Sequence, residues 1–428
     1  MINESKRLLE EQELVLGEAP GWTARVLRAF PAFHHPNYRL FFVGQLTSLI
    51  GTWMHIVALG WLVLILTNSA FWVAFVQALD LFPILLFSLP AGILADRKEK
   101  RLILIAMQTV MMLVAFLFAM LTQANSINLL LIMILTIVSG IAHAVEMPAR
   151  QSFMFEVVGK KDLASAIALN VGMFNSARVI GPAIAGLLIA FFSIPIAFFL
   201  NGLSFLAVLF VLLKMKVTTT LVSTPHAHPL EQLKEGIRFA STHPVISTLL
   251  IVVAFNSLIP FSYSSIMPVL AKETFHVGSE GLGLLFSAAG LGALFGAIFV
   301  SNRVGSPNVS RIIGIGNLLA STTLIFFSIV ASFTIALILL SIIGFSLVLQ
   351  ISLANATIQK ASPDHIRGRV MSVYALMFLG LMPFGNILMG SLASLLGPQE
   401  AVRILAIISL FGTAFYWLLL KPRLKLAQ

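Results

Sequence analysis

Two long stretches of this chain contain no charged residue. Between Leu40 and Leu79, and again between Leu102 and Val145, there is no Asp, Glu, Lys or Arg. A helix needs about 20 apolar residues to cross a membrane once, so each stretch is long enough for two crossings. A polar, turn-like segment interrupts each stretch, at 67–69 and at 122–126. Each stretch therefore predicts two membrane-spanning helices joined by a tight turn.

The composition supports this interpretation and excludes several kinds of chemistry. The 428 residues are 58% hydrophobic and only 10% charged, whereas a soluble globular protein is roughly a quarter charged. There is no cysteine, which excludes disulfide frameworks, thiolate metal sites, iron–sulfur clusters and cysteine nucleophiles. Residues 1–16 mix Glu and Lys without an apolar core, so we expect no cleaved signal peptide.

The same pattern continues along the chain and predicts an all-α integral membrane protein with twelve transmembrane helices. The expected spans are about 38–66, 71–95, 101–122, 128–148, 164–190, 195–213, 245–271, 280–301, 309–330, 333–358, 370–396 and 401–420. One long connection follows the sixth span. Within it, Leu230 to Phe239 repeats apolar residues at helical spacing with charges between them, which is typical of a helix lying at the membrane surface.

This connection divides the chain into two halves of six spans. The expected parts are an amino-terminal segment (1–37), a six-helix half (38–213), a connecting loop with an amphipathic helix (214–244), a second six-helix half (245–420) and a tail (421–428). The halves resemble each other: Asp162-Leu-Ala-Ser-Ala precedes the fifth span and Asp364-His-Ile-Arg precedes the eleventh, and Pro182 and Pro383 lie within those spans. Two pseudo-symmetric halves are typical of transporters that rock one half against the other.

The positions of the basic residues predict the orientation. All but three of the 27 Lys and Arg residues fall in segments on one side of the membrane, the exceptions being Lys272, Arg403 and Arg178. The positive-inside rule makes that side cytoplasmic and predicts that both termini are cytoplasmic. The net charge of +10 therefore reflects topology and contact with anionic lipid, and we expect no nucleic-acid partner.

A glycine followed by a charged cluster lies between the second and third spans. The segment from Gly92 to Arg101, Gly-Ile-Leu-Ala-Asp-Arg-Lys-Glu-Lys-Arg, resembles the loop 2–3 signature of the major facilitator superfamily, with Glu99 in place of the second glycine. The resemblance implies a latch at a cytoplasmic gate. Gly92 would allow close helix approach, Asp96 would face the amino end of a neighbouring helix, and Arg97 and Arg101 would pair with acidic groups. The alternative is a basic loop that only sets topology.

The middle of the fifth span contains Gly181-Pro182-Ala-Ile-Ala-Gly186. This segment resembles the antiporter motif of the same superfamily, Gly-x-x-x-Gly-Pro-x-x-Gly-Gly, with Ala177 in place of the first glycine and one closing glycine instead of two. The resemblance favours export. The alternative is a helix kink that serves packing, because Gly and Pro are common in transmembrane helices.

Two charged residues lie deep inside predicted spans. Asp80 lies about 24 Å from the cytoplasmic edge of a membrane core about 30 Å thick, and Arg178 about 21 Å from the same edge. Our hypothesis is that both face a central cavity and are electrostatically coupled, so that Arg178 holds an anionic substrate or favours the ionised form of Asp80, and protonation of Asp80 frees Arg178. The alternative is a fixed structural ion pair.

Glu146 and Arg150 lie four residues apart at the cytoplasmic end of the fourth span. The spacing allows a local ion pair, although Pro148 lies between them. We consider two roles for this pair. It takes part in the cytoplasmic gate with Arg97, or it is a pair of interfacial side chains whose charged ends reach toward water.

Further polar residues occur within the predicted spans. Spans 1, 4, 7 and 10 line the cavity in the superfamily, so the resemblance makes several of these residues candidate substrate contacts; for any one of them, an interhelical hydrogen bond is the alternative. The set is His55, His143, Asn175, Asn256, Tyr263, Gln350, Asn355 and Asn386. His226 and His228 have no further ligands nearby, so we expect no metal and no other cofactor.

Nearly the whole chain resembles the major facilitator superfamily, and four segments resemble its branch of enterobactin exporters and macrolide efflux pumps. These segments begin at Pro36, Met147, His228 and Pro363. The resemblance implies a bacterial inner-membrane transporter, not an enzyme, that exports a small amphiphilic siderophore or drug-like metabolite by proton antiport. We expect its partners to be that molecule, protons and lipid, and the protein to be a monomer.

Other functions fit the sequence less well. A proton symporter that imports its solute is disfavoured by the partial antiporter motif. A membrane enzyme would need clustered histidines or acidic residues, but the adjacent His34 and His35 have no such neighbours in the sequence. There is no nucleotide-binding Gly-x-x-x-x-Gly-Lys-Ser/Thr pattern, which argues against direct use of ATP.

Overall fold

The computed structural model describes residues 30–215, 229–301, 303, 306 and 308–420. Most of the predicted amino-terminal segment, residues 216–228 of the connecting loop with His226 and His228, and the tail 421–428 lie outside the described residues. Every regular element in the described ranges is helical. This agrees with the all-α membrane fold predicted from the charge-free stretches.

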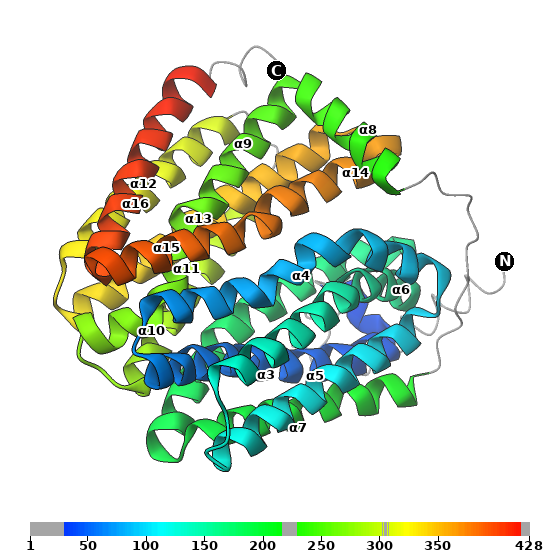
Figure 1. Cartoon of the computed structure of the whole chain (residues 1–428). Helices are drawn as coiled ribbons and strands as arrows, with labels where there is room; N and C mark the ends of the chain where they lie inside the picture. Colours follow the sequence, from blue (N-terminus) through cyan, green and yellow to red (C-terminus); the bar gives the residue numbers. More distant parts are fainter. Residues whose placement is uncertain (1–29, 216–228, 302, 304–305, 307, 421–428) are drawn as a thin grey trace, which may run out of the picture.

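The first half of the chain forms a bundle of long helices. Its elements are η1 (Pro31–His34), α3 (Pro36–Thr67), α4 (Ala70–Arg97), α5 (Lys100–Gln123), α6 (Leu129–Phe191) and α7 (Ile194–Lys214). Figure 1 shows these helices packed side by side, with α3 against α6 and α7, and α5 against the same two helices.

The second half repeats this arrangement with more interruptions. Its elements are α8 (Pro229–Thr242), α9 (Pro244–Leu258), η2 (Pro260–Ile266), α10 (Met267–Val269), η3 (Leu270–Thr274), α11 (Ser279–Ser301), α12 (Val309–Ile329), α13 (Phe333–Ala361), α14 (Asp364–Ala375), η4 (Leu376–Gly380), α15 (Met382–Leu396), α16 (Pro398–Phe415) and η5 (Tyr416–Leu420). The amphipathic segment of the connection is helix α8, which packs against α14.

The helix α6 contains two of the predicted spans. Its 63 residues would measure about 95 Å as one straight helix, which is about three times the thickness of a bilayer core. Gly159 breaks the helical path with φ 70° and ψ 176°, a conformation open to glycine. The eleven helical stretches long enough to cross a membrane in the described residues therefore contain twelve spans, as predicted. The helix of the fourth span continues past the expected limit of that span at 148 and reaches this glycine.

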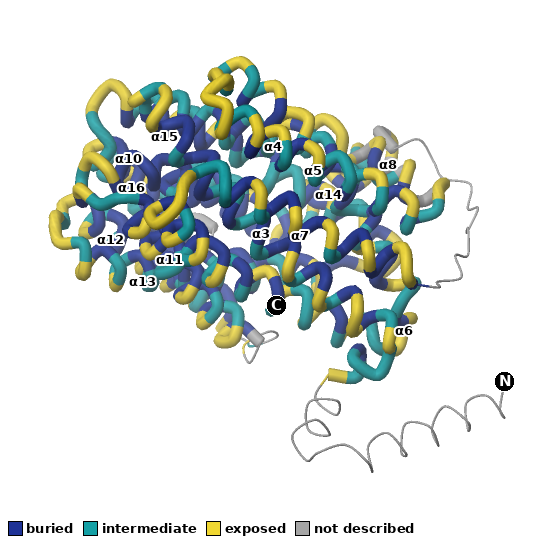
Figure 2. Tube along the Cα trace, turned by 90° about the horizontal axis from the view of Figure 1, so that it is seen from below, coloured by how far each residue is buried: buried dark blue, intermediate teal, exposed yellow. Residues whose placement is uncertain are grey.

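The surface of the helix bundle is apolar. Figure 2 shows exposed positions along the outside of the helices and buried positions between them. Phe191, Leu395 and Phe411 are 77%, 79% and 72% exposed. Large apolar side chains at such exposure require a lipid environment, since a soluble monomer rarely shows extended apolar patches. The described chain is therefore a multi-pass membrane protein.

The two halves meet along a seam, which we define as the contacts of residues 60–85 and 178–186 with residues 265–290 and 380–390. Side chains donate hydrogen bonds to backbone carbonyls across it: Ser279 to Gly186 at 3.2 Å, Ser287 to Val179 at 2.7 Å and Gln77 to Ser265 at 3.1 Å. In Figure 1 the halves meet at the left, and α4 diverges from α14 toward the right.

Small residues allow the seam to close. A Cβ atom at Gly186 would lie 2.6 Å from the Ser279 carbonyl oxygen, and one at Gly390 would lie 2.5 Å from the Cβ of Ala74. Gly186 follows Pro182 in α6, and Gly390 follows Pro383 in α15. Each half therefore contributes one proline-containing span whose glycine packs against the start of a helix in the other half. This is the pseudo-symmetry predicted from the sequence.

The opposite end of the bundle is packed differently, and we call it the open end. A Cβ atom added at Gly92, Gly172 or Gly368 would meet nothing within 4 Å. These glycines lie toward the ends of α4, the second span of α6 and α14 that are farther from the seam. The halves are thus tightly joined at one end, while glycines suited to close approach stand apart at the other.

Candidate functional site

Asp80 in α4 and His143 in α6 form a mid-span ion pair. Oδ1 of Asp80 lies 3.9 Å from Nδ1 of His143, and the two side chains are 29% and 30% exposed. Gly140 brings the helices together, since a Cβ atom there would lie 2.4 Å from the Asp80 carbonyl oxygen. His143 follows Gly140 by one helical turn and so reaches the same level. The pair is held by backbone packing.

His55 in α3 lies on the same side of the first half. Its ring makes edge-to-face contacts with Phe118 and Phe198, at centroid distances of 5.1 and 4.9 Å. Its Nδ1 atom is buried and has no hydrogen-bond partner. His55 is also close enough to His143 to interact with it electrostatically. The first half therefore contains a group of two imidazoles and one carboxylate.

Arg178 in α6 occupies a separate position. Its guanidinium carbon lies 5.6 Å from the centroid of the Trp53 ring, which is a cation–π distance. In the described part of the chain, no ion pair joins Arg178 to Asp80. The two deep charges thus have different immediate partners: an imidazole for Asp80 and an aromatic ring for Arg178. Tyr263 of η2, in the second half, is the titratable group that interacts electrostatically with Arg178.

The Gly181-Pro182 segment of the fifth span contacts two other helices, α3 and α11. A Cβ atom at Gly181 would lie 2.6 Å from the Trp53 Cβ, so this glycine brings α6 against α3 beside Arg178. Pro182 has no N–H and leaves a carbonyl free one turn earlier. The freed carbonyl is that of Arg178, and the hydroxyl of Ser287 donates a hydrogen bond to the adjacent carbonyl, that of Val179, at 2.7 Å.

Two predicted cavity residues of the second half instead bind each other. The Asn256 amide donates to Gln350 at 2.7 Å and to Asn317 at 3.1 Å. All three side chains are buried, and they come from α9, α13 and α12. For Asn256 and Gln350, interhelical hydrogen bonds of this kind fix the packing of three spans.

The other predicted cavity residues lie apart from one another. Asn175 is buried in α6 and donates to the Val171 carbonyl at 2.9 Å, while Asn386 is buried in α15. Asn355 accepts a hydrogen bond at 2.6 Å from Gln359 in α13. The Tyr263 hydroxyl is buried without a hydrogen-bond partner. Of the predicted set, the structure therefore groups His55 and His143 with Asp80.

The Glu146–Arg150 ion pair forms as the spacing predicts. Nε of Arg150 lies 3.0 Å from Oε1 of Glu146, despite Pro148 between them. The amide of Gln108 in α5 makes a long contact of 3.5 Å with the same carboxylate oxygen. Glu146 is buried, so the pair joins α5 to α6 within the helix bundle.

The residues of the loop 2–3 signature lie at the open end. Arg97 is exposed at the end of α4, and Asp96 lies on the same helix with its side chain outside the described part of the structure. Arg101 donates hydrogen bonds to the carbonyls of Leu212 and Leu213 at 2.6 and 2.9 Å. A cation at the carboxyl end of α7 is favourable. Arg101 thus binds backbone carbonyls where an acidic partner was predicted.

A buried ion pair that was not predicted from the sequence lies next to this signature. Nζ of Lys100 lies 2.8 Å from Oε1 of Glu156, and the side chains are 10% and 8% exposed. Lys100 begins α5, and Glu156 lies in the part of α6 beyond the predicted end of the fourth span. The sequence contains a sign of this buried charge. Glu156 is the single charged residue in the otherwise apolar stretch from Phe153 to Val158, and it lies one turn before a glycine.

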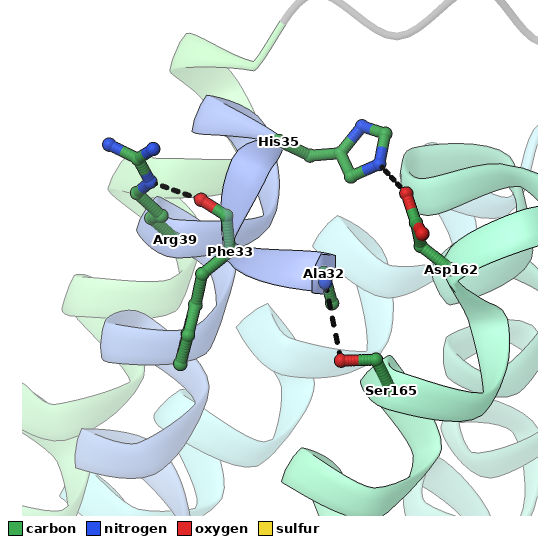
Figure 3. Close-up of polar contacts among 6 residues, drawn as sticks. All are labelled: Ala32, Phe33, His35, Arg39, Asp162 and Ser165. Carbon is green, nitrogen blue, oxygen red and sulfur yellow. Dashed lines mark hydrogen bonds and ion pairs between the residues drawn. The ribbon is translucent and has the colours of Figure 1, made fainter. Parts of the chain in front are cut away.

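The segment formed by η1 and the start of α3 is anchored to the second span of α6, as Figure 3 shows. His35 and Asp162 form a pair at 2.8 Å between Nε2 and Oδ2. The backbone amide of Ala32 donates to the hydroxyl of Ser165 at 3.2 Å. Arg39 donates to the carbonyl of Phe33. These contacts fix η1 and the start of α3 on the first half at the open end.

The chain is similar to several transporters of known role. It is 28% identical to the staphyloferrin A transporter of Staphylococcus aureus, over 91% of this chain and 98% of that protein. It is 25% identical to the multidrug efflux pump Tap of Mycolicibacterium fortuitum, over 90% and 96% of the two chains. It is 23% identical to the enterobactin exporter EntS of Escherichia coli O127:H6, over 85% and 87%.

Solved transporter structures have the same fold. A bacterial homologue of the human lysosomal transporter Spinster, in an inward-facing and unoccupied conformation, superposes with a TM-score of 0.70 at 15% identity and covers 92% of this chain and 97% of that one. A POT family transporter in complex with a thioalcohol-conjugated peptide gives a TM-score of 0.72 at 13% identity, over 90% and 96%. The family model described as transmembrane secretion effector matches residues 28–427. The protein therefore belongs to this family of major facilitator superfamily transporters.

Proposed function

We propose that this protein exports a small amphiphilic molecule, a siderophore or a drug-like metabolite, from the bacterial cytoplasm by alternating access and proton antiport. Its family and relatives are transporters of the siderophore and drug efflux type, not enzymes. The direction, the coupling ion and the substrate class are the parts that we propose. The positive-inside rule supports cytoplasmic termini, and the bacterial transporters to which the chain is similar support the inner membrane.

The observation that carries the proposal is the one-ended seam between the halves. With the termini cytoplasmic, the seam lies on the outer side, and the open end faces the cytoplasm. A transporter at rest in this conformation is ready to accept a molecule from inside the cell. Rocking the halves would separate the seam and bring the glycines of the open end into contact, which is the motion that releases substrate outside.

Arg178 supports an anionic or electron-rich group on the substrate. Burying a cation in the middle of a membrane protein costs free energy, and such residues either pair with another group or mark a functional site. The Trp53 ring stabilises the guanidinium by about 0.5–2 kcal/mol and leaves its N–H groups to bind a ligand. We assign Asp80 to proton coupling. We assign three further charged residues to the cytoplasmic gate: Arg97, Glu146 and Arg150.

Transport in proteoliposomes tests the direction and the coupling. Staphyloferrin A, enterobactin and ethidium are used as separate radiolabelled probes, first in counterflow and then with an imposed pH gradient. Antiport predicts accumulation when the lumen is acidic and its collapse by nigericin. Accumulation that requires an acidic exterior would instead identify a symporter. Absence of counterflow for all three probes would overturn the proposed substrate class.

Replacing Arg178 with alanine should lower counterflow of the transported probe at least about tenfold, which corresponds to about 1.4 kcal/mol of lost binding. Arg178→Lys keeps the charge but not the planar stacking on Trp53, so an intermediate rate is expected. Arg403→Ala removes an arginine that pairs with Glu400 at the surface and serves as the control. A folded Arg178→Ala protein that transports at the normal rate would exclude Arg178 as a substrate contact.

A further inference from the structure

The Asp80–His143 pair lies directly beside the moving surface of the first half. One turn before Asp80, Gln77 donates its hydrogen bond across the seam. Half a turn after it, Phe82 meets Phe384 of α15 with ring centroids 6.3 Å apart. A change in the charge of Asp80 is therefore felt within one helical turn of two contacts that must break when the halves rock.

The surroundings of Asp80 leave His143 as its ionic partner. Of the elements packed against α4, α3 supplies His55 and η2 supplies Tyr263, while α10, α15 and η4 contain no titratable side chain. Helices α5 and α8 also contact α4. In α5, Lys100 pairs with Glu156 and Arg101 binds carbonyls of α7. The charged residues of α8 are Glu231, Lys234, Glu235 and Arg238, of which Glu235 pairs with Arg369. The other charged groups of α6 at or near mid-span have partners of their own: Glu146 binds Arg150, and Arg178 lies over Trp53. In the part of the chain that the structure describes, His143 forms the ion pair with Asp80.

The separation of the two groups suits a transferable proton. At 3.9 Å the nitrogen and oxygen are farther apart than in a direct hydrogen bond of about 2.7–3.2 Å, so a small shift or one bridging water completes the path. Both side chains retain nearly a third of their surface exposed, which keeps them accessible to protons. With one proton the pair is neutral overall, and without it the pair has a charge of −1, which is unfavourable in a membrane interior.

We propose that Asp80 and His143 together form the proton-carrying unit of this transporter, separate from Arg178. The inference rests on the proposed antiport. In the transfer step the Nδ1–H bond of protonated His143 breaks and an O–H bond forms at Asp80, so the total charge of the pair is unchanged. Loss of that proton leaves one negative charge beside the seam. His55 is a neighbouring imidazole that interacts electrostatically with His143.

The test follows the conformation of the full chain in lipid nanodiscs as pH is varied, with no substrate present. The protein contains no cysteine, so two pairs of introduced cysteines can carry spin labels without background. Gln151→Cys with Lys360→Cys reports on the open end, and Ser126→Cys with Ser332→Cys reports on the seam end; all four positions are exposed. Distances between the labels are measured by double electron–electron resonance from about pH 5 to pH 8, the range in which His titrates.

We expect the wild-type distance distribution to shift with pH. Asp80→Asn should abolish the shift, and His143→Gln should displace its midpoint by at least about one pH unit. The double variant should behave like Asp80→Asn alone, because the two groups act as one unit. His365→Gln makes the same chemical change at an exposed position and should leave the midpoint unchanged.

Two results would overturn the inference. One is a His143→Gln midpoint equal to that of the wild type while Asp80→Asn loses the shift, since His143 would then take no part. The other is a midpoint displaced equally by Arg178→Gln, which removes the charge, and by His143→Gln, since Asp80 would then be coupled to Arg178 as strongly as to His143. A failure of the proposed export is distinguishable from these results. In that case the wild-type protein shows the pH-dependent shift in distance, but no probe accumulates in liposomes with an acidic lumen.

Discussion

Replacing Glu156 with glutamine is expected to lower the free energy of unfolding by about 3–5 kcal/mol. The ammonium group of Lys100 would then remain buried at the start of α5 with no counter-charge. Lys100 also lies in the first turn of its helix, where the helix dipole disfavours a cation. The measurement is the midpoint of thermal unfolding in detergent, followed by the fluorescence of the tryptophans, compared with wild-type protein.

Two further variants make the Glu156 prediction specific. The double variant Lys100→Met with Glu156→Met should recover most of the lost stability, because an apolar pair of similar volume removes both buried charges. Asp364→Asn breaks the pair with Arg367, in which Asp364 is 89% exposed, and should change the midpoint little. A Glu156→Gln protein as stable as Asp364→Asn would show that the buried pair does not hold α5 to α6.

Replacing Gly186 with leucine is expected to force the seam apart and to lower transport to below about a tenth of the normal rate. A Cβ atom at Gly186 would already overlap the backbone of α11, as it lies 2.6 Å from the Ser279 carbonyl oxygen, and a leucine side chain cannot be accommodated without moving that helix. The spin labels at Ser126 and Ser332 should move apart, and those at Gln151 and Lys360 should approach.

The matched control for Gly186 is Gly172 in the same helix. A Cβ atom at Gly172 meets nothing within 4 Å in the described conformation, so Gly172→Leu should leave this conformation intact. It should instead hinder closure of the open end and hold the protein in the described state. The two substitutions are thus expected to slow transport through opposite shifts in the same two distances. Equal shifts in one direction would contradict rocking about the seam.

The spans were predictable because the membrane imposes a simple rule on composition. A charge-free stretch such as 40–79 has to cross the bilayer, and α3 and α4 begin and end within a few residues of the predicted limits. The fourth span was expected to end at Pro148, and the helix that contains it runs on beyond that residue to Gly159. The helix continues because Phe153 and Val158 are buried against neighbouring helices, and this packing is not visible in local sequence.

The deep charges show a different limit of sequence reasoning. Depth along a helix follows from residue number at 1.5 Å per residue, so Asp80 and Arg178 were correctly singled out as charges within the spans. Which neighbour each one faces depends on helix rotation and on contacts between distant segments. Gly140 allows α4 and α6 to approach closely, and this places Asp80 beside His143. Gly181 allows α3 and α6 to approach closely, and this places Arg178 over the ring of Trp53.

The chemistry of the seam has a consequence for how the protein responds to salt. Backbone carbonyls, hydroxyls, amides, glycines and aromatic rings join the halves there, and the ammonium group of Lys272 donates a hydrogen bond to the Asn68 amide oxygen at 2.7 Å. In the described ranges no ion pair crosses from one half to the other. Ionic strength weakens attractions between charges, with a screening length of about 8 Å at physiological salt. The contacts of the seam should therefore change little in strength from low salt to about 1 M, so that a salt dependence of the balance between the two conformations arises at the charged open end.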